Sequence, residues 1–94
     1  MKKLNVDEKM MDDLYETLLS IKSKKDLKLF LDDLCTDNEL DQMACRIKAA
    51  RLLLDNETYN EIIEKTNISS ATLSRVSRCV KYGKGYNLAL KNKK

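Results

Sequence analysis

Apolar residues recur at steps of three and four along most of the chain, with polar and charged residues between them. This period places the apolar side chains on one face of an α-helix, whereas strict alternation would indicate a β-strand. The chain contains no proline, and its two glycines stand at positions 83 and 85. We therefore predict an all-α fold without internal repeats.

The first predicted helix runs from about Asp7 to Ile21. Its apolar stripe comprises Met10, Met11, Leu14, Leu18 and Ile21. A lysine-rich linker, residues 22–25, is expected to precede a short helix for which Ser23 offers a weak N-cap. The apolar residues of this short helix are Leu27, Phe30, Leu31 and Leu34.

A capping pattern, Thr36-x-x-Glu39, opens a long central helix that we expect to end near Asp55. In this pattern the threonine hydroxyl accepts a hydrogen bond from an early amide, while the carboxylate reaches back to the amide of the cap. The apolar positions that follow form one stripe at helical spacing, made of Leu40, Met43, Ile47, Ala50 and Leu54.

Residues 58–80 have the outline of a helix-turn-helix motif, in which a short helix and a second helix are joined by a tight turn. The pattern Thr58-x-x-Glu61 predicts the start of the first helix, and Ile62 and Ile63 supply its apolar inner face. The short apolar face predicts that this helix packs against the one that follows it.

The turn has the residues that such a motif needs. Asn67 can adopt positive φ, Ile68 can fill the space between the two helices, and Ser69 is a good N-cap for the second helix. The predicted inner stripe of that helix is Leu73, Val76 and Val80. The residues assigned to its other faces are Ser70, Thr72, Ser74, Arg75, Ser77 and Arg78.

These outward residues indicate DNA binding. Small side chains at the N-terminal end of the second helix would let it approach a major groove, where hydroxyls bond to base edges or phosphates. Serine and threonine are weak helix formers, so a surface without a function would be better served by Glu, Lys or Ala. The predicted DNA-binding residues are Asn60, Ser70, Ala71, Thr72, Ser74, Arg75, Arg78, Lys81 and Lys84.

The charge distribution supports the same interpretation. Residues 1–64 have a net charge of −5, whereas residues 65–94 contain 8 Lys and Arg residues and no acidic residue. A segment of one sign attracts polyanions or anionic surfaces. A solvated basic tail is the alternative, but several of these cations precede the last residues of the chain.

The sequence Tyr82-Gly83-Lys84-Gly85-Tyr86 is expected to end the second helix, with Gly83 in the left-handed conformation that closes many helices. We expect both tyrosines to pack back on the domain, and stacking on sugars and bases is the alternative. The remaining residues, 87–94, form either a short amphipathic turn or a loose basic arm.

The composition bounds the class of protein. A chain of 94 residues with 43% hydrophobic residues, no Trp and one Phe can build only a small aliphatic core, so partner chains are expected on energetic grounds. The chain has no histidine, and its three cysteines lack CxxC spacing, which favours reduced thiols over a metal site. We expect no enzymatic activity, no transmembrane helix, no signal peptide and a cytoplasmic location.

Residues 34–86 resemble the Trp repressor family (TrpR-like), and within it most nearly the YerC/YecD branch. The most specific stretches are ATLSRV at residues 71–76 and YGKGY at residues 82–86, standing after the Thr36-x-x-Glu39 helix start. The resemblance implies an intertwined, all-α homodimer in which the N-terminal helices of both subunits share one core. It also implies transcriptional repression through helix-turn-helix heads displayed on either side of that dimer.

Family members that bind tryptophan hold it between the central helix and the recognition helix. The resemblance places Arg46 and Arg75 at the positions of the two arginines that flank the indole, and Thr36 at a threonine of the same pocket. Two positions depart from the family, because Val76 replaces a glycine and Cys79 replaces a serine that helps to hold the ligand. A thiol donates hydrogen bonds weakly, and valine would occupy space left for indole. We therefore expect a vestigial pocket and no tryptophan cofactor.

Arg46 has two interpretations. It is expected to be a partly buried arginine paired with an acid such as Asp41 or with a helix end, and a role in an anion or ligand site is the alternative. For Arg75, contact with DNA is expected instead, because its charged neighbours are basic.

The predicted protein is thus a sequence-specific, double-stranded-DNA-binding regulator, acting as a homodimeric repressor. We expect one domain composed of N-terminal dimerisation helices (1–35), a central helix with the DNA-binding head (36–82, motif about 58–80) and a basic C-terminal tail (83–94). The main alternative is a helical protein-interaction adaptor whose basic end meets an acidic partner without binding duplex DNA. Binding to single-stranded nucleic acid would need stacking aromatics, for which only Tyr82 and Tyr86 are placed.

Overall fold

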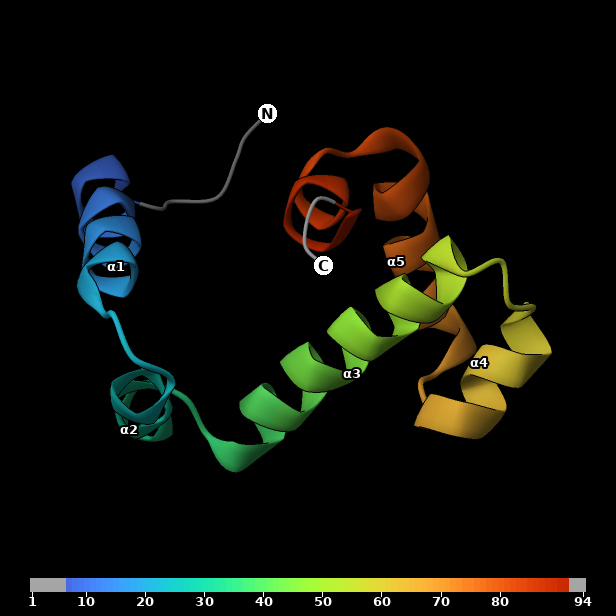
Figure 1. The fold of residues 1–94 in the computed structure, drawn as a ribbon, viewed down its shortest axis with the longest axis horizontal. Coiled ribbons are helices and arrows are strands. Elements are labelled where there is room, and N and C mark those ends of the chain that lie inside the picture. The colour runs from blue at the N-terminus through green and yellow to red at the C-terminus, as the bar shows by residue number, and fades with distance from the viewer. Residues whose placement is uncertain (1–6, 92–94) are drawn as a thin grey trace. The chain divides into compact units, whose positions relative to one another are not determined.

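The computed structural model describes residues 7–91 as a series of helices (Figure 1). These are α1 (Glu8–Ser20), α2 (Lys24–Leu34), α3 (Asp37–Leu54), α4 (Tyr59–Thr66), α5 (Ser70–Tyr82) and a π-helical turn, η1 (Asn87–Lys91). No strand occurs within residues 7–91, which confirms the predicted all-α class. The chain divides into two compact units, one ending at Thr36 and the other beginning at Asp37.

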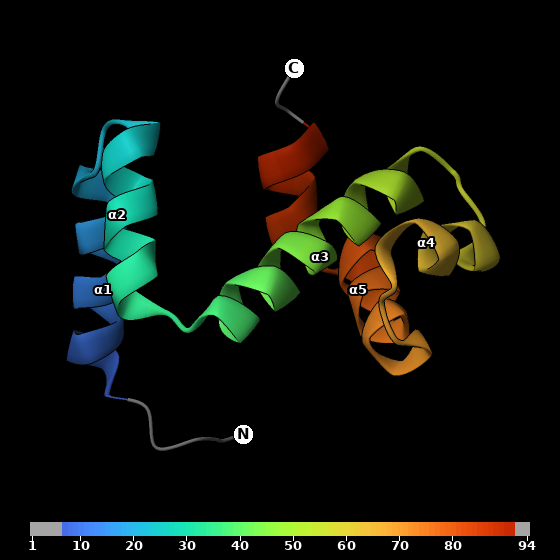
Figure 2. The same ribbon diagram turned by 90° about the horizontal axis from the view of Figure 1, so that it is seen from below.

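The first unit consists of α1 and α2, joined by a short connection (Figure 2). Asp7 caps α1 by accepting a hydrogen bond of 2.8 Å from the Lys9 amide, and Ser23 caps α2 by accepting one of 3.0 Å from the Asp26 amide. The predicted cap at Ser23 is confirmed. The predicted linker at 22–25 is too long, because the cap starts α2 at Lys24 and lysine is a good helix former.

The first unit has no core of its own. Neither α1 nor α2 contains a buried residue, and several large apolar side chains face solvent, with Met10 70%, Leu19 80% and Leu29 58% exposed. Met10 is therefore not the core residue that its spacing predicts. No helix among the described residues is long and apolar enough to cross a membrane.

The second unit holds the core of the chain. Helices α4 and α5 both pack on α3, and Figure 1 shows α3 as the long helix beside which the other two lie. The buried apolar side chains come from all three helices and from the turn between α4 and α5, and they are Ala49, Ala50, Leu52, Ile62, Ile68, Leu73 and Val76.

Helix α3 has apolar side chains on two opposite faces, and sequence periodicity identified only one of them. At about 100° per residue, the predicted stripe through Leu40, Met43 and Ile47 lies almost opposite the face through Ala49 and Leu52. The second face is the one that packs against α4 and α5, with Ala49 fully buried. The predicted stripe lies largely outside this core, since Ile47 is 45% exposed.

The end of α5 differs from the prediction at Gly83. This residue has φ −89° and ψ −179°, which is extended backbone and not the left-handed conformation. Its amide donates a hydrogen bond of 2.8 Å to the Cys79 carbonyl oxygen. A Cβ at this position would lie 2.7 Å from that same oxygen, so a close approach of backbone, and not positive φ, is what favours glycine here.

The chain then turns back onto the second unit. Tyr86 and Leu90 pack against the core, and the Asn87 side-chain amide donates a hydrogen bond of 2.8 Å to the Val80 carbonyl oxygen. Of the two alternatives for the C-terminal residues, the structure shows a helical turn over Asn87–Lys91. Residues 92–94 lie outside the described part of the chain.

Candidate nucleic-acid interface

A reciprocal pair of hydrogen bonds fixes the start of α4. The Glu61 amide donates to the Thr58 hydroxyl at 3.2 Å, and the Thr58 amide donates to the Glu61 carboxylate at 2.9 Å. These bonds, first the backbone one and then that with the hydroxyl, lower the pKa of Glu61. The capping box predicted from Thr58-x-x-Glu61 is confirmed.

The turn between α4 and α5 is held by the side chain of Thr66 and the conformation of Asn67. Asn67 has φ 64°, the positive value predicted for it. The Thr66 hydroxyl donates to the Ile62 carbonyl oxygen at 2.7 Å and accepts from the Ile68 amide at 3.2 Å. Ile68 is only 6% exposed, so the predicted role of this side chain between the helices is confirmed.

Ser69 begins α5. Its hydroxyl accepts a hydrogen bond of 3.1 Å from the Thr72 amide and donates one of 2.9 Å to the Thr72 hydroxyl. The predicted N-cap is confirmed. Because Thr72 is bonded on both its amide and its hydroxyl, its half-buried side chain is held in one place at the N-terminal end of the helix.

Helix α5 has a buried face and an exposed face. Leu73 and Val76 are buried as predicted, and Val80 packs against the core from a half-buried position. Ser77 is also buried, at 7% exposure, so its assignment to an outer face is wrong. The sequence pattern missed it because a small hydroxyl side chain can fill a position beside an apolar stripe. The exposed residues of α5 are Ser70, Ala71, Ser74, Arg75, Arg78, Lys81 and Tyr82.

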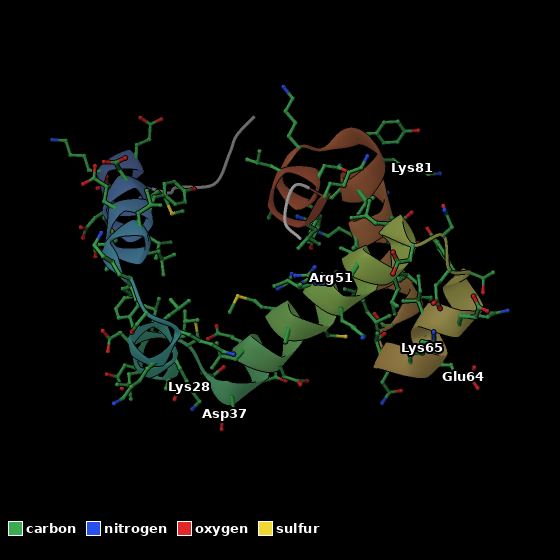
Figure 3. The ribbon with its side chains drawn as sticks, in the orientation of Figure 1. Lys28, Asp37, Arg51, Glu64, Lys65 and Lys81 are labelled. Carbon is green, nitrogen blue, oxygen red and sulfur yellow. The ribbon has the colours of Figure 1, made fainter. Side chains whose placement is uncertain are left out.

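The charges on the exposed face of α5 are all positive. Arg75, Arg78 and Lys81 are its only charged residues, and within residues 7–91 none of the three forms an ion pair. The cation of α4, Lys65, is instead bound to Glu57 at 2.7 Å. Figure 3 shows Lys65 and Lys81 well apart on the surface of the second unit. The α5 cations are therefore available to an anionic partner.

Two predicted DNA-binding residues lie outside α5. Asn60 is exposed on α4, and Lys84 is exposed just beyond Gly83. The structure thus places all nine predicted residues in the second unit. Eight of them lie on α5 or directly after it.

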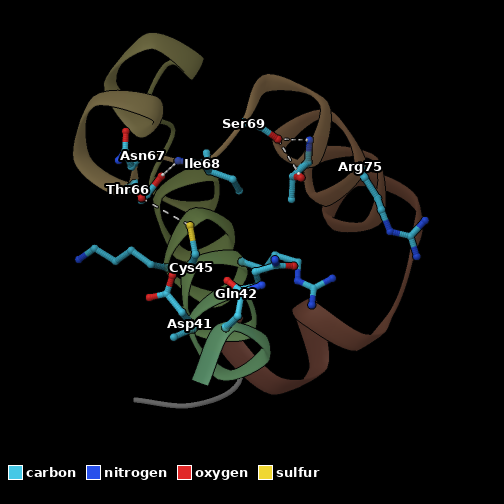
Figure 4. Close-up of a pocket in the computed structure, with 13 residues that line it drawn as sticks. Asp41, Gln42, Cys45, Thr66, Asn67, Ile68, Ser69 and Arg75 are labelled. Atoms are coloured by element: carbon cyan, nitrogen blue, oxygen red, sulfur yellow. Dashed lines mark hydrogen bonds between the residues drawn. The ribbon is translucent and has the colours of Figure 1, made fainter. Parts of the chain in front are cut away.

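An open cavity of about 690 Å³ lies between α3 and the start of α5 (Figure 4). Arg46 lines it from α3 and Arg75 from α5, so two of the residues assigned to a vestigial ligand pocket share one cavity. Val76 and Cys79 are not among its lining residues, and Val76 belongs to the core. Thr36 belongs to the first unit.

Arg46 does not form the ion pair expected of it. Asp41 lines the same cavity, yet no ion pair joins Arg46 to any residue in the described part of the chain. In Figure 4 the Arg75 side chain extends away from Cys45, which lies on the α3 side of the cavity. The cavity therefore presents two arginines without carboxylate partners. No group of residues within 7–91 could hold a metal ion.

Two features of the interface escaped the sequence analysis. Thr66 orders the turn through its hydroxyl, but a threonine at a helix end has no distinctive sequence pattern. Tyr82 was expected to pack on the domain, yet it is 81% exposed. Its position four residues after Arg78 could have placed it on the arginine face of α5.

Comparisons with known proteins identify relatives over most of the chain. A family model described as Trp repressor protein matches residues 9–94. The uncharacterised protein YerC of Bacillus subtilis (strain 168) is 43% identical over 83 residues, which span 87% of this chain and 80% of YerC.

Two solved structures share the fold. A TrpR-like protein from Eubacterium eligens superposes with a TM-score of 0.86 at 35% identity, covering 90% of this chain and 89% of the other. A crystal structure of a protein from Staphylococcus aureus gives a TM-score of 0.85 at 30% identity, covering 90% of this chain and 86% of the other.

Proposed function

The chain belongs to the Trp repressor family, and from this premise we propose that it is a sequence-specific DNA-binding transcriptional regulator that represses its target genes in the cytoplasm. In this proposal α5 is the recognition helix. Its N-terminal residues, Ser70, Ala71 and Thr72, enter the major groove, and the cations further along contact phosphates.

The exposed face of α5 is the observation that carries the proposal. Burial of Leu73 and Val76 turns the opposite side of the helix toward solvent, and that side combines small side chains at the N-terminal end with cations that lack ion-pair partners. Small side chains permit close approach to base edges, and free cations bind phosphate and release counterions. Asn60 and Lys84 extend this surface on either side of α5.

We propose that the protein binds DNA as a homodimer. The first unit lacks buried residues, and the second unit leaves the Ile47 face of α3 outside its core. A second copy of the chain would cover these apolar surfaces and supply the core that 94 residues cannot build alone. A two-fold dimer of this kind would place its recognition helices in successive major grooves, about 34–36 Å apart.

We propose no tryptophan cofactor. The cavity with Arg46 and Arg75 is present, but Val76 and Cys79 replace the glycine and serine that the family resemblance associates with tryptophan binding. Repression would then not depend on tryptophan. Binding to operator DNA should be unchanged when tryptophan is added, as measured by fluorescence anisotropy.

Salt-dependent binding to duplex DNA tests the proposal. If about four cations of the dimer neutralise phosphates, the logarithm of the association constant should fall against the logarithm of salt concentration with a slope of about −3.6. Footprinting on the genomic neighbourhood of its own gene would then locate the operator. A helical adaptor that binds an acidic protein would show no affinity for duplex DNA at any salt concentration, and that result would overturn the proposal.

A further inference from the structure

Tyr82 is an aromatic residue that the fold leaves in solvent. Its exposure is 81%, whereas Tyr86, four residues later, packs against the core. Tyr82 makes no hydrogen bond or ion pair within residues 7–91, and its sequence neighbours include Lys81 and Lys84. The fold thus uses the ring of one of these tyrosines and not that of the other.

Helical geometry places Tyr82 in line with the proposed DNA-binding residues. Ala71, Arg75, Arg78 and Tyr82 follow one another at steps of four, three and four residues, which keeps them on one side of an α-helix. That side lies opposite the buried Leu73 face. Tyr82 is therefore the last member of the row that begins at Ala71.

The length of α5 determines what Tyr82 can reach. At a rise of about 1.5 Å per residue, Tyr82 lies about 16 Å along the helix axis from Ala71. The major groove is about 12 Å wide, so when Ala71 is in the groove Tyr82 lies at or beyond its edge. The group available there is the sugar-phosphate backbone.

We propose that Tyr82 is a further DNA-contacting residue, whose phenol donates a hydrogen bond to a backbone phosphate while its ring covers the adjacent sugar. Tyrosine hydroxyls are among the side-chain groups that bind phosphates in protein–DNA complexes. This inference rests on the proposed function. It assigns Tyr82 to affinity and register, and leaves sequence discrimination to the residues at the N-terminal end of α5.

A neutral phosphate contact has a distinctive signature. The phenol carries no charge, so it binds phosphate without neutralising it and should release no counterion. Removal of the Tyr82 hydroxyl should therefore lower affinity at every salt concentration and leave the salt slope unchanged. Removal of Arg78 should instead reduce the slope by about 0.9 per phosphate contact that is lost.

The experiment compares Tyr82→Phe with Tyr86→Phe in the full chain, by fluorescence anisotropy with an operator duplex and with an unrelated duplex over a series of salt concentrations. Both substitutions remove one hydroxyl and keep the ring. We expect Tyr82→Phe to weaken binding to both duplexes by about tenfold, the effect of a lost hydrogen bond to a charged acceptor, with unchanged slope. Tyr86→Phe should bind like the unsubstituted chain.

Each other outcome contradicts a stated part of the proposal. Unchanged affinity in Tyr82→Phe would overturn the contact, and so would an equal loss in Tyr86→Phe, which would indicate a structural effect. A loss confined to the operator duplex would overturn the phosphate assignment, because a backbone contact does not distinguish sequences. Failure of the unsubstituted chain to bind any duplex would overturn the proposed function together with this inference.

Discussion

The Cys45 thiol lies 3.5 Å from the Thr66 carbonyl oxygen and donates a hydrogen bond to it, which joins α3 to the last residue of α4 (Figure 4). The Thr66 hydroxyl bonds in turn to the Ile62 carbonyl oxygen and to the Ile68 amide. The turn that precedes α5 is therefore fixed to the central helix at one residue. The orientation of α5 depends on the same contacts.

Thr66→Val should destabilise the protein by about 1–2 kcal/mol, because it keeps the shape of the side chain but leaves the Ile68 amide without its acceptor. Urea denaturation followed by circular dichroism measures the free energy of unfolding. Thr66→Ser keeps the hydroxyl and should stay close to the unsubstituted chain. Equal stability of the valine and serine variants would show that the hydroxyl does not order the turn.

The capping box of α4 should make stability depend on pH. Hydrogen bonds from Thr58 lower the pKa of Glu61 from its ordinary value of 4.5, so the ionised form stabilises the folded state. This contribution is complete above about pH 4.5 and is lost as the pH falls through the lower pKa of the folded state.

Glu61→Gln isolates that contribution, because glutamine can still complete a capping box but does not titrate. Between pH 5 and pH 3, the free energy of unfolding should fall more steeply for the unsubstituted chain than for Glu61→Gln. Parallel curves for the two proteins would remove Glu61 from the acid response.

Arg75→Ala should weaken binding to duplex DNA without changing helicity or dimerisation, since the arginine is exposed and forms no ion pair in the described chain. If it contacts one phosphate, the salt slope should also decrease by about 0.9 per contact. Fluorescence anisotropy and circular dichroism measure these effects. Lys28→Ala, on α2, is a suitable control, and an Arg75→Ala protein with unchanged affinity would refute the assigned face.

Thr72→Ala should change the preference among operator sequences more than it changes nonspecific affinity. The amide of residue 72 can still bond to Ser69, so the cap survives while the hydroxyl at the start of α5 is removed. Competition binding against a panel of duplexes with single base-pair changes measures the preference. Thr72→Ser should retain the original preference, and a uniform loss across the panel would argue against base contact by Thr72.

Ile47→Glu should prevent dimerisation and leave the core of the second unit intact. The residue is 45% exposed on the α3 face that lies outside that core, where a carboxylate costs little in a monomer but much in an apolar interface. Sedimentation velocity measures the change in mass. Gln42→Glu adds the same charge on the cavity side of α3 and should remain dimeric. A dimeric Ile47→Glu protein would exclude this face from the interface.

Local chemistry in the sequence predicted the elements of the DNA-binding head well. The capping box of α4, the positive φ of Asn67 and the cap at Ser69 each depend on residues within three positions of one another. Such features form wherever the chain is locally helical, so a single sequence contains the information that specifies them. The boundaries of α1 and α5 follow for the same reason.

Features that depend on packing could not be predicted in this way. Helix α3 is apolar on two faces, and periodicity cannot tell which face the same chain covers. Tyr82 and Tyr86 have similar sequence surroundings, but only the turn of the chain after Gly83 brings Tyr86 to the core. The cavity with Arg46 and Arg75 likewise forms from residues far apart in sequence, and only the family resemblance paired them beforehand.

The crowding at Gly83 has a consequence for how the chain can vary. Any side chain at position 83 would collide with the last turn of α5, whereas a Cβ at Gly85 meets no atom within 4 Å. In a saturation library selected for folding, position 85 should therefore accept many amino acids while position 83 keeps glycine. One hydrogen atom thus sets the direction in which the chain leaves the recognition helix.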